Sequence, residues 1–479
     1  MAAPRRAWTV VPRVAVNQTF TDNVAAGAGG AQADQITDIS PGIRVSGETA
    51  RVKLFADYSL RNFFHAQDQS RNRSQNALNA FGTLEAIDRW LYIDAGWTIA
   101  QQSVSALGAQ TTGAGTVNAN STESSNFRFS PYLRGNFGRL ADYEFRYTFN
   151  KTSNKSASSS DSSSDTISAR IVGATAFANL GWALEGNLQS VGYSGGRRSE
   201  NDLYRARANY AINPALRINA SVGYEENDFS TTEKQGRTTH GYGFEWSPTE
   251  RTKASFFRES RFFGFGHNIS VTHRTPLTSW RFTDTRDVTT STNQSGGATV
   301  GTYFDLLYAQ LASSIPDPVA RTQQVNATLQ QAGIAPTAAV TGGFLSSRVT
   351  VSRRQELSLI LNGRRNTVAY TLFQSDQQAA TGGGGLRDDF GAASSIRQSG
   401  MSSNFSHRIS ALTSLNMFSS WQQSQSSAGQ STQSKTATVG LSTRLSPRTS
   451  AAVNVRTSRQ KGATQFTENA VVGGLNLTF

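Results

Sequence analysis

Residues 471–479 read Val-Val-Gly-Gly-Leu-Asn-Leu-Thr-Phe, which puts Val471, Gly473, Leu475, Leu477 and Phe479 on alternate positions and ends the chain on an aromatic ring. Successive side chains of a β-strand point to opposite faces, so a period of two predicts a strand with one apolar face. The same period recurs upstream at residues 52–61, 141–149 and 216–225. We therefore predict an all-β chain.

The alternating stretches are long. They run for about ten to fifteen residues, the length that a tilted strand needs to cross a bilayer and project beyond it, whereas strands of soluble sandwiches average about five or six. The C-terminal stretch with its final Phe479 resembles the signal by which the barrel-assembly machinery recognises outer-membrane proteins. The alternative is an ordinary last strand of a soluble β protein.

The composition agrees with a barrel that has one face in lipid and one in water. The chain has 479 residues, of which 37% are hydrophobic and 10% aromatic, and no run approaches the ~18 apolar residues of a spanning helix. It has no cysteine, which excludes disulfides and thiolate sites. The net charge is +13, but the arginines are scattered along strands, so we expect no nucleic-acid partner. A basic barrel would instead contact outer-membrane lipids and anionic lipopolysaccharide.

The connections alternate between short and long. Short turns are predicted at residues 47–49, 86–88, 213–214, 247–249, 362–364 and 446–448, and long surface loops at residues 21–37, 105–122, 152–164, 194–200, 226–236, 377–393 and 424–433. Tight periplasmic turns and long surface loops are the outer-membrane pattern. The fold class that follows is a single closed antiparallel transmembrane β-barrel over residues 1–479, with about 22 strands (roughly 20 to 24) and both termini periplasmic. We expect Met1 to begin a mature chain whose leader has been removed.

Residues 292–344 form a long extracellular loop in this interpretation, and residues 302–333 within it have helical spacing. Thr302 with Asp305 resembles a capping box, and Asp317-Pro318 supplies a second helix start. Either the two short helices form a surface flap or they fold into the lumen as a plug. The plug candidates are the apolar residues Phe304, Leu307, Leu311, Val319, Val325 and Leu329. We expect no helix outside the 292–344 loop.

The inward face carries the candidate functional residues, because alternation assigns to it a charged, amide-rich and hydroxyl-rich wall. The lumen-lining candidates are Lys53, Arg61, Arg128, Arg134, Arg205, Arg207, Arg217, Arg354, Arg444 and Arg456. Each could instead form a solvated cross-strand ion pair that only stiffens the barrel. Inward aromatics such as Phe257 and Phe373 accompany them, while outward aromatics near the strand ends should form two girdles.

No catalytic or metal site is predicted. The five histidines have no partner at metal-ligand spacing, and the glycine run at residues 382–385 has no helix after it to bind phosphate. The serine run at residues 156–164 is a low-complexity loop. We expect neither an enzyme nor a cofactor.

The strand number sets the width of the lumen. With ~4.8 Å between strands and a tilt of ~40°, 22 strands close at roughly 40–45 Å, and side chains leave roughly 25–30 Å. Barrels of this size that import by energy transduction carry a large N-terminal plug, and the first strand here is expected near Trp8, which argues against that class.

Several stretches resemble one family. They are Asp57-Tyr58-Ser59-Leu60 with Arg71-Asn72-Arg73, Ser130-Pro131-Tyr132-Leu133-Arg134, Gly363-Arg364-Arg365-Asn366-Thr367, and the runs at residues 406–410 and 412–416. Together they resemble the outer-membrane β-barrel family associated with PEP-CTERM/exosortase systems, over nearly the whole chain. These motifs mark strands and turns, and the family offers no catalytic or ligand residues to transfer.

The resemblance implies a function in export. Members of that family accompany genes for exopolysaccharide synthesis, so we expect a channel that passes a polysaccharide substrate through the outer membrane with a periplasmic polysaccharide-export protein beneath it. The alternatives are a general or substrate-selective porin for small solutes, or a structural barrel in a surface assembly.

Overall fold

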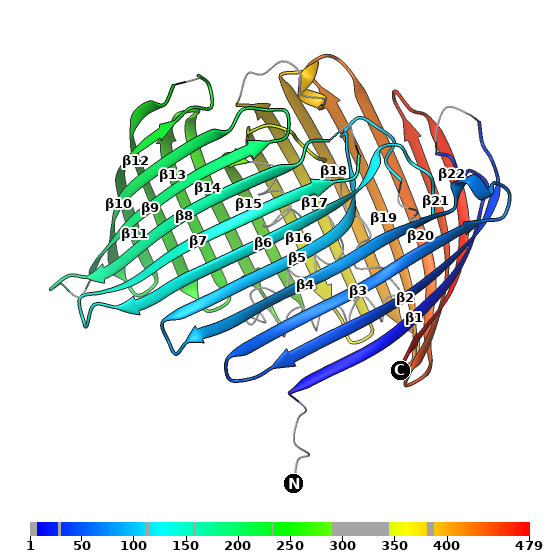
Figure 1. Cartoon of the computed structure of the whole chain (residues 1–479). Helices are drawn as coiled ribbons and strands as arrows, with labels where there is room; N and C mark the ends of the chain where they lie inside the picture. Colours follow the sequence, from blue (N-terminus) through cyan, green and yellow to red (C-terminus); the bar gives the residue numbers. More distant parts are fainter. Residues whose placement is uncertain are drawn as a thin grey trace, which may run out of the picture.

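The computed structural model describes residues 7–479 apart from 27–29, 112, 114, 157–158, 178, 232, 290–343 and 381–387. It contains one antiparallel sheet of 22 strands, in which β1 pairs with both β2 and β22, so that the sheet closes into a barrel (Figure 1). The predicted fold and strand count are confirmed. The strands are β1 (Trp8–Thr21), β2 (Asp34–Glu48), β3 (Val52–His65), β4 (Arg73–Ile87), β5 (Leu91–Ser103), β6 (Ser121–Asn136), β7 (Ala141–Asn154), β8 (Ser162–Ala174), β9 (Leu180–Tyr193), β10 (Ser199–Asn213), β11 (Leu216–Asn227), β12 (Gln235–Thr249), β13 (Thr252–Arg261), β14 (Gly264–Arg274), β15 (Thr278–Thr289), β16 (Thr350–Asn362), β17 (Asn366–Ala379), β18 (Ser395–Arg408), β19 (Thr413–Ser426), β20 (Ser431–Ser446), β21 (Thr449–Lys461) and β22 (Phe466–Thr478).

The C-terminal stretch is the closing strand. Residues 470–478 of β22 pair with residues 13–21 of β1, with Leu475 opposite Val16 and Val471 opposite Phe20. These four side chains are between 38% and 52% exposed. Directly opposite residues of an antiparallel pair share a face, so the apolar residues form one continuous outer surface across the seam.

The two rims of the barrel differ in their connections. Both termini lie at one rim, here called the terminus rim, whose ten turns contain two to five residues each (Figure 1). Most connections at the opposite rim, here called the loop rim, are longer. Three predicted turns were displaced by two or three residues: the turn expected at residues 47–49 lies at 49–51, that expected at 86–88 lies at 88–90, and that expected at 247–249 lies at 250–251. The strands continue through the expected turn residues because their ladder bonds still have partners.

The outer face carries the aromatics expected there. Trp8, Phe64, Phe127, Tyr224, Trp246 and Trp280 are between 38% and 48% exposed. Phe149, Trp182 and Trp421 are half-buried and lie on the same strand faces as exposed apolar residues. Exposed aromatics near strand ends are typical of the two membrane interfaces.

The apolar outer stripe is not equally long on all strands. On β11 it runs from Leu216 to Tyr224, whereas on β17 it covers only residues 368–372 and on β16 only residues 357–361. Above the short stripes, Asp284 of β15 accepts two hydrogen bonds from Arg353 of β16, at 3.1 and 2.7 Å. A charged cluster therefore faces outward on this side of the barrel.

The helical segment predicted at residues 302–333, with all its plug candidates, lies outside the described residues and stays a prediction. The expectation of no helix outside residues 292–344 was wrong in detail, because two single-turn 3₁₀ helices, η1 (Gln69–Arg71) and η2 (Asp389–Gly391), occur in loop-rim connections. Short Asp-initiated turns of this kind need no apolar periodicity and leave little sequence signal. In the described part of the chain, no helix is long and apolar enough to cross a membrane.

Candidate functional site

The inner wall is polar and crossed by ion pairs. Three inward residues of neighbouring strands meet near the seam, where Arg13 of β1 and Arg44 of β2 both bind the carboxylate of Asp57 on β3, the latter at 2.6 Å. Arg61, a predicted lumen residue, pairs with Asp38 of β2 at 2.6 Å. Asp57 and Asp38 are buried, so each carboxylate depends on its guanidinium partners for charge compensation.

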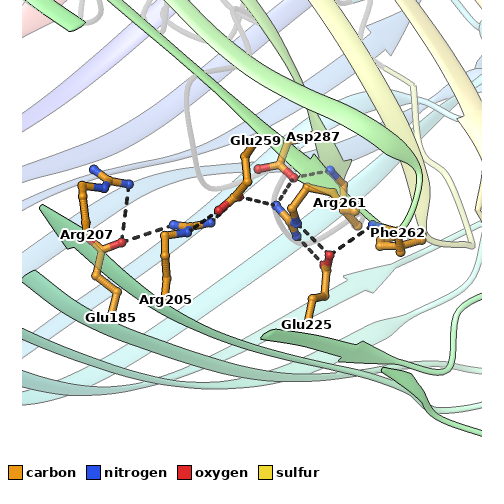
Figure 2. Close-up of polar contacts among 9 residues, drawn as sticks. Glu185, Arg205, Arg207, Glu225, Glu259, Arg261, Phe262 and Asp287 are labelled. Atoms are coloured by element: carbon orange, nitrogen blue, oxygen red, sulfur yellow. Dashed lines mark hydrogen bonds and ion pairs between the residues drawn. The ribbon is translucent and has the colours of Figure 1, made fainter. Parts of the chain in front are cut away.

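Two other predicted lumen residues, Arg205 and Arg207, lie in one network (Figure 2). Arg207 lies 3.6 Å from Glu185, which in turn lies 3.2 Å from Arg205. Arg205 also donates two hydrogen bonds of 2.7 Å to Glu259 on β13, three strands away. Opposite charges thus alternate along the wall.

Two glycines allow the Arg205 side chain to extend from β10 to Glu259 on β13. Gly223 of β11 stands opposite Arg205, and Gly241 of β12 stands opposite Glu259. A Cβ atom at Gly223 would lie 2.2 Å from the Tyr204 carbonyl and 2.8 Å from the Thr239 hydroxyl. Because these inward positions lack side chains, the Arg205 guanidinium can pass over two strands to its partner.

The network continues toward the loop rim through a buried pair. Arg261 donates from Nη2 to Glu225 at 2.6 Å and from Nε at 2.9 Å, and Glu225 also accepts from the Phe262 amide (Figure 2). Arg261 lies 3.2 Å from Asp287 on β15 as well. This part of the wall was not predicted as a site, and alternate polar residues near the end of β13 were the only signal for it.

The remaining predicted lumen residues are distributed around the wall. Two are stacked on rings: Arg134 lies 4.0 Å from the centre of Tyr92, and Arg354 lies 5.4 Å from that of Phe373 and 3.1 Å from Glu356. The other five lie apart from one another. Two form ion pairs: Arg456 with Glu468 at 2.7 Å and Lys53 with Glu48 at 3.1 Å. Three are placed by the strand register: Arg128 opposite Gly96, Arg217 opposite Glu245, and Arg444 opposite Ser450.

An aromatic strip lies on the inner wall toward the terminus rim. Tyr92 stacks on Tyr132 with ring centres 5.2 Å apart, and Phe55 stacks on Phe81 at 5.4 Å. The Arg146 guanidinium lies 3.8 Å from the centre of Tyr132. Phe55 and Tyr92 are buried, so the wall offers the half-buried rings of Phe81 and Tyr132 next to guanidinium donors.

The loop between β5 and β6, residues 104–120, crosses the mouth of the barrel at the loop rim. It was expected to be a surface loop, and this expectation was wrong. Thr432 of β20 donates to the Leu107 carbonyl at 2.7 Å, and Gln460 of β21 accepts from the Gln110 amide at 2.7 Å. Thr116 then donates to Glu468 of β22 at 3.1 Å. The loop is held by inward polar residues of distant strands, which a local sequence pattern does not reveal.

A second segment, residues 344–349, crosses the mouth from β5 toward β16. Phe344 forms a parallel bridge with Ser103, the last residue of β5. Four residues on, Arg348 donates two hydrogen bonds to Asp388, at 2.9 and 2.7 Å. The side chains of this pair are 5% and 2% exposed, so the pair is shielded from solvent on both sides.

A third segment, residues 388–394 before β18, joins the other two. Asp389 accepts hydrogen bonds from the Ser105 hydroxyl at 2.6 Å and the Ala106 amide at 2.7 Å. Burial raises the pKa of the Asp389 carboxyl above its ordinary value, and these two hydrogen bonds offset only part of the rise. Leu107, Phe344 and Phe390 pack in one buried cluster nearby.

These three segments together, residues 104–120 (112 and 114 excepted), 344–349 and 388–394, are called the cap below. They meet over the lumen at the loop rim, and their contacts are one ion pair, a few hydrogen bonds and a small apolar cluster. The site that the structure offers is therefore a polar lumen with a cap across one mouth.

Known structures share this architecture. The FrpB iron transporter of Neisseria meningitidis (F3-3 variant) is similar with a TM-score of 0.51 at 8% identity, over 99% of this chain and 82% of that one. The siderophore receptors PirA of Pseudomonas aeruginosa and of Acinetobacter baumannii match with TM-scores of 0.46 and 0.47, each at 9% identity over 98% of this chain and 80% of theirs. No protein-family model and no curated protein matches the sequence.

The likeness to FrpB decides the fold. This chain is an outer-membrane β-barrel. Its closed sheet and apolar outer face are those of an integral outer-membrane protein, as the sequence predicted. At 8% identity the likeness carries no substrate from one protein to the other.

Proposed function

We propose that the chain forms a gated outer-membrane conduit for a hydrophilic polymer, closed at rest by the cap. The observation that carries the proposal is that two separate segments, residues 104–120 and 344–349, cross the mouth and are held there by buried contacts. Segments held in this way form a closure with a definite stability, and a sufficiently strong competing interaction can displace them.

The width of the barrel explains why a closure is needed. Its 22 strands leave a lumen of roughly 25–30 Å between side chains, whereas general diffusion porins manage with 16 to 18 strands. An uncapped lumen of this width would let periplasmic solutes escape. A conduit that must pass something bulky, yet remain tight between transits, requires both the width and the cap.

The wall chemistry supports a sugar polymer as the cargo. A pyranose ring presents C–H faces that pack on aromatic rings and hydroxyls that bind amides and guanidinium groups. In the strip, Phe81 and Tyr132 are only half-buried and keep part of their rings accessible, and Arg134 and Arg146 beside them supply donors, while Phe55 and Tyr92 are buried and support these rings. The resemblance to the barrels of exosortase systems supports the same cargo, an exopolysaccharide leaving the cell, with a periplasmic polysaccharide-export protein docked at the terminus rim.

Single-channel recording tests the conduit. Residues 105–119 would be replaced by a short Gly-Ser link between β5 and β6, and the loop of residues 66–72, which lies outside the cap, would be replaced in the control. We expect the unaltered protein to be nearly closed, the cap variant to conduct several-fold more, and the control to behave like the unaltered protein. A steady large conductance from the unaltered protein, unchanged by the cap deletion, would identify a porin for small solutes instead.

The cargo needs its own test. Deleting the gene should abolish secreted polysaccharide, and re-expressing the unaltered barrel should restore it. Normal secretion in the deletion strain would refute the export function even if the gating results hold.

A further inference from the structure

A small pocket opens on the inner wall at the terminus rim, on the side opposite the aromatic strip. It has a volume of about 110 Å³ and lies between β13, β14, β15 and β16. Four cationic side chains line it, with a single carboxylate, that of Glu250: the cations are Arg251, Lys253, Arg274 and Arg281. This charge ratio differs from that of the network around Arg205, where guanidinium groups and carboxylates alternate.

The strand register produces this grouping. Lys253 stands opposite Thr272, Thr272 opposite Arg281, and Arg281 opposite Ser358, in one row across four strands. In the next row toward the rim, Arg274 stands opposite Ser279. Neighbouring positions in such rows lie about 5 Å apart, so ammonium, guanidinium and hydroxyl donors converge on one small volume.

The electrostatic consequence is an affinity for anions. Arg251, which precedes β13, and Arg274 of β14 are neighbours, and the Arg274 amide donates to the Arg251 carbonyl at 2.9 Å. Like charges on neighbouring positions of a sheet destabilise it, and an anion between the cations removes the repulsion while accepting their hydrogen bonds. Lys253, Arg251 and Arg274 are exposed to the lumen, so an anion can reach them. We infer that the pocket is an anion-binding site that takes a carboxylate or phosphate group.

The turns around the pocket extend its field. The ten turns of the terminus rim contain seven exposed arginines and two acids; the arginines are Arg51, Arg89, Arg139, Arg251, Arg364, Arg365 and Arg448, and the acids are Asp88 and Glu250. A ring of one sign around a low-dielectric opening concentrates ions of the other sign there. The rim thus attracts anions and the pocket binds them.

The site also defines the class of polymer, in a step that rests on the proposed function. A chain entering at the terminus rim meets the basic ring first, with the anion pocket on one wall and the aromatic strip on the other. The cargo that fits all three is a polysaccharide with repeated carboxylate or phosphate groups.

The anion site is tested without any transport. Isothermal titration of the full chain in detergent with pyrophosphate measures binding directly, in parallel with the single variant Lys253→Gln and the double variant Arg274→Gln/Arg281→Gln. We expect saturable binding that weakens at least tenfold in the double variant and less in the single one. The control, Lys435→Gln/Arg459→Gln, removes two charges from the outer face and should bind as the unaltered protein does. Equal binding by all variants overturns the site.

The polymer class is tested separately, with the cap-deleted barrel in a planar bilayer. Short oligogalacturonate added on the side of the terminus rim should block the current, maltohexaose should block it several-fold less, and the Arg274→Gln/Arg281→Gln change should reduce the block by oligogalacturonate alone. Equal block by the two sugars overturns the polyanion. A cap-deleted barrel that carries no current contradicts the proposed conduit and leaves the result of the titration as it stands.

Discussion

The charged residues at the two ends of this barrel differ in burial and pairing. At the loop rim, buried carboxylates such as Asp388 and Glu225 each bind a guanidinium group within 2.7 Å, and segments of chain cover them. At the terminus rim, short turns expose arginines, and in the described part of the chain each connection there is a turn of two to five residues. Burial explains the difference, because a covered charge must be paired, whereas an exposed one keeps its hydration and acts at a distance. One end is therefore built to close and the other to attract.

The largest test of the closed end removes one half of its buried ion pair. Arg348→Ala leaves Asp388 buried without its partner, which costs about 3–5 kcal/mol. That energy opposes the closed cap and not the barrel, so the ratio of open to closed channels should rise by a hundredfold or more in single-channel recordings. Arg397→Ala, which breaks an exposed pair on the outer face, should change nothing. A closed Arg348→Ala channel would show that the pair does not hold the cap.

A smaller effect is expected from the apolar cluster of the cap. Leu107→Ala deletes part of a buried cluster, which costs roughly 2 kcal/mol and corresponds to roughly a thirtyfold shift toward the open cap. Amide hydrogen exchange should report it as faster exchange at Gln110, whose amide is bound to Gln460. The exposed outer residue Leu441 serves as the control position for the same substitution. An unchanged exchange rate at Gln110 would show that exchange of this amide does not depend on opening of the cap.

The exposed arginines of the terminus rim should make the channel current depend on the sign of the voltage. In the cap-deleted barrel, the exposed arginines of one rim should give a current that differs a few-fold between the two voltage signs at low salt. The asymmetry should vanish near 1 M KCl, where the screening length falls to about 3 Å. An asymmetry that persists at high salt would have to come from the shape of the lumen and not from the basic ring.

The smallest expected effect is a pH dependence of the closed end. Because the pKa of Asp389 is raised in the closed cap, that state binds more protons than the open one. The protonated Asp389 carboxyl therefore stabilises the closed cap at acid pH. This stabilisation is lost as the pH rises through the raised pKa of Asp389. The unaltered channel should therefore open slightly more often as the pH increases from about 4 to 7. Asp389→Asn should flatten this dependence, and opening on acidification would contradict the sign.

The fold could be predicted because the two faces of a barrel strand contact different environments, so the polarity of the side chains alternates from one residue to the next. Lipid on one side and water on the other force alternation such as Val52, Leu54 and Ala56 against Lys53, Phe55 and Asp57, and this pattern fixes both strand and face. The inner and outer sides of the wall followed from it without any knowledge of the register between strands.

The cap could not be predicted in the same way. Residues 104–120 are small and polar like any surface loop, and their contacts with Gln460 and Glu468 join positions about 350 residues apart in sequence. Leu107, the largest apolar residue of this loop, was a signal that could have been used. The anion pocket was missed for a related reason. Alternation places Arg274 and Arg281 on the inner face, but only the register across the turns brings them beside Lys253.

The uneven outer stripe has a consequence for the membrane around the barrel. On β16 and β17 the apolar surface spans five residues, against nine on β11, so the hydrocarbon that can be matched there is only about half as thick. Lipid must thin beside those strands, or the barrel must lean until its taller side is fully covered. Either response distinguishes one flank of the molecule, and hydrophobic mismatch then gives an otherwise round barrel a preferred tilt and preferred lipid neighbours.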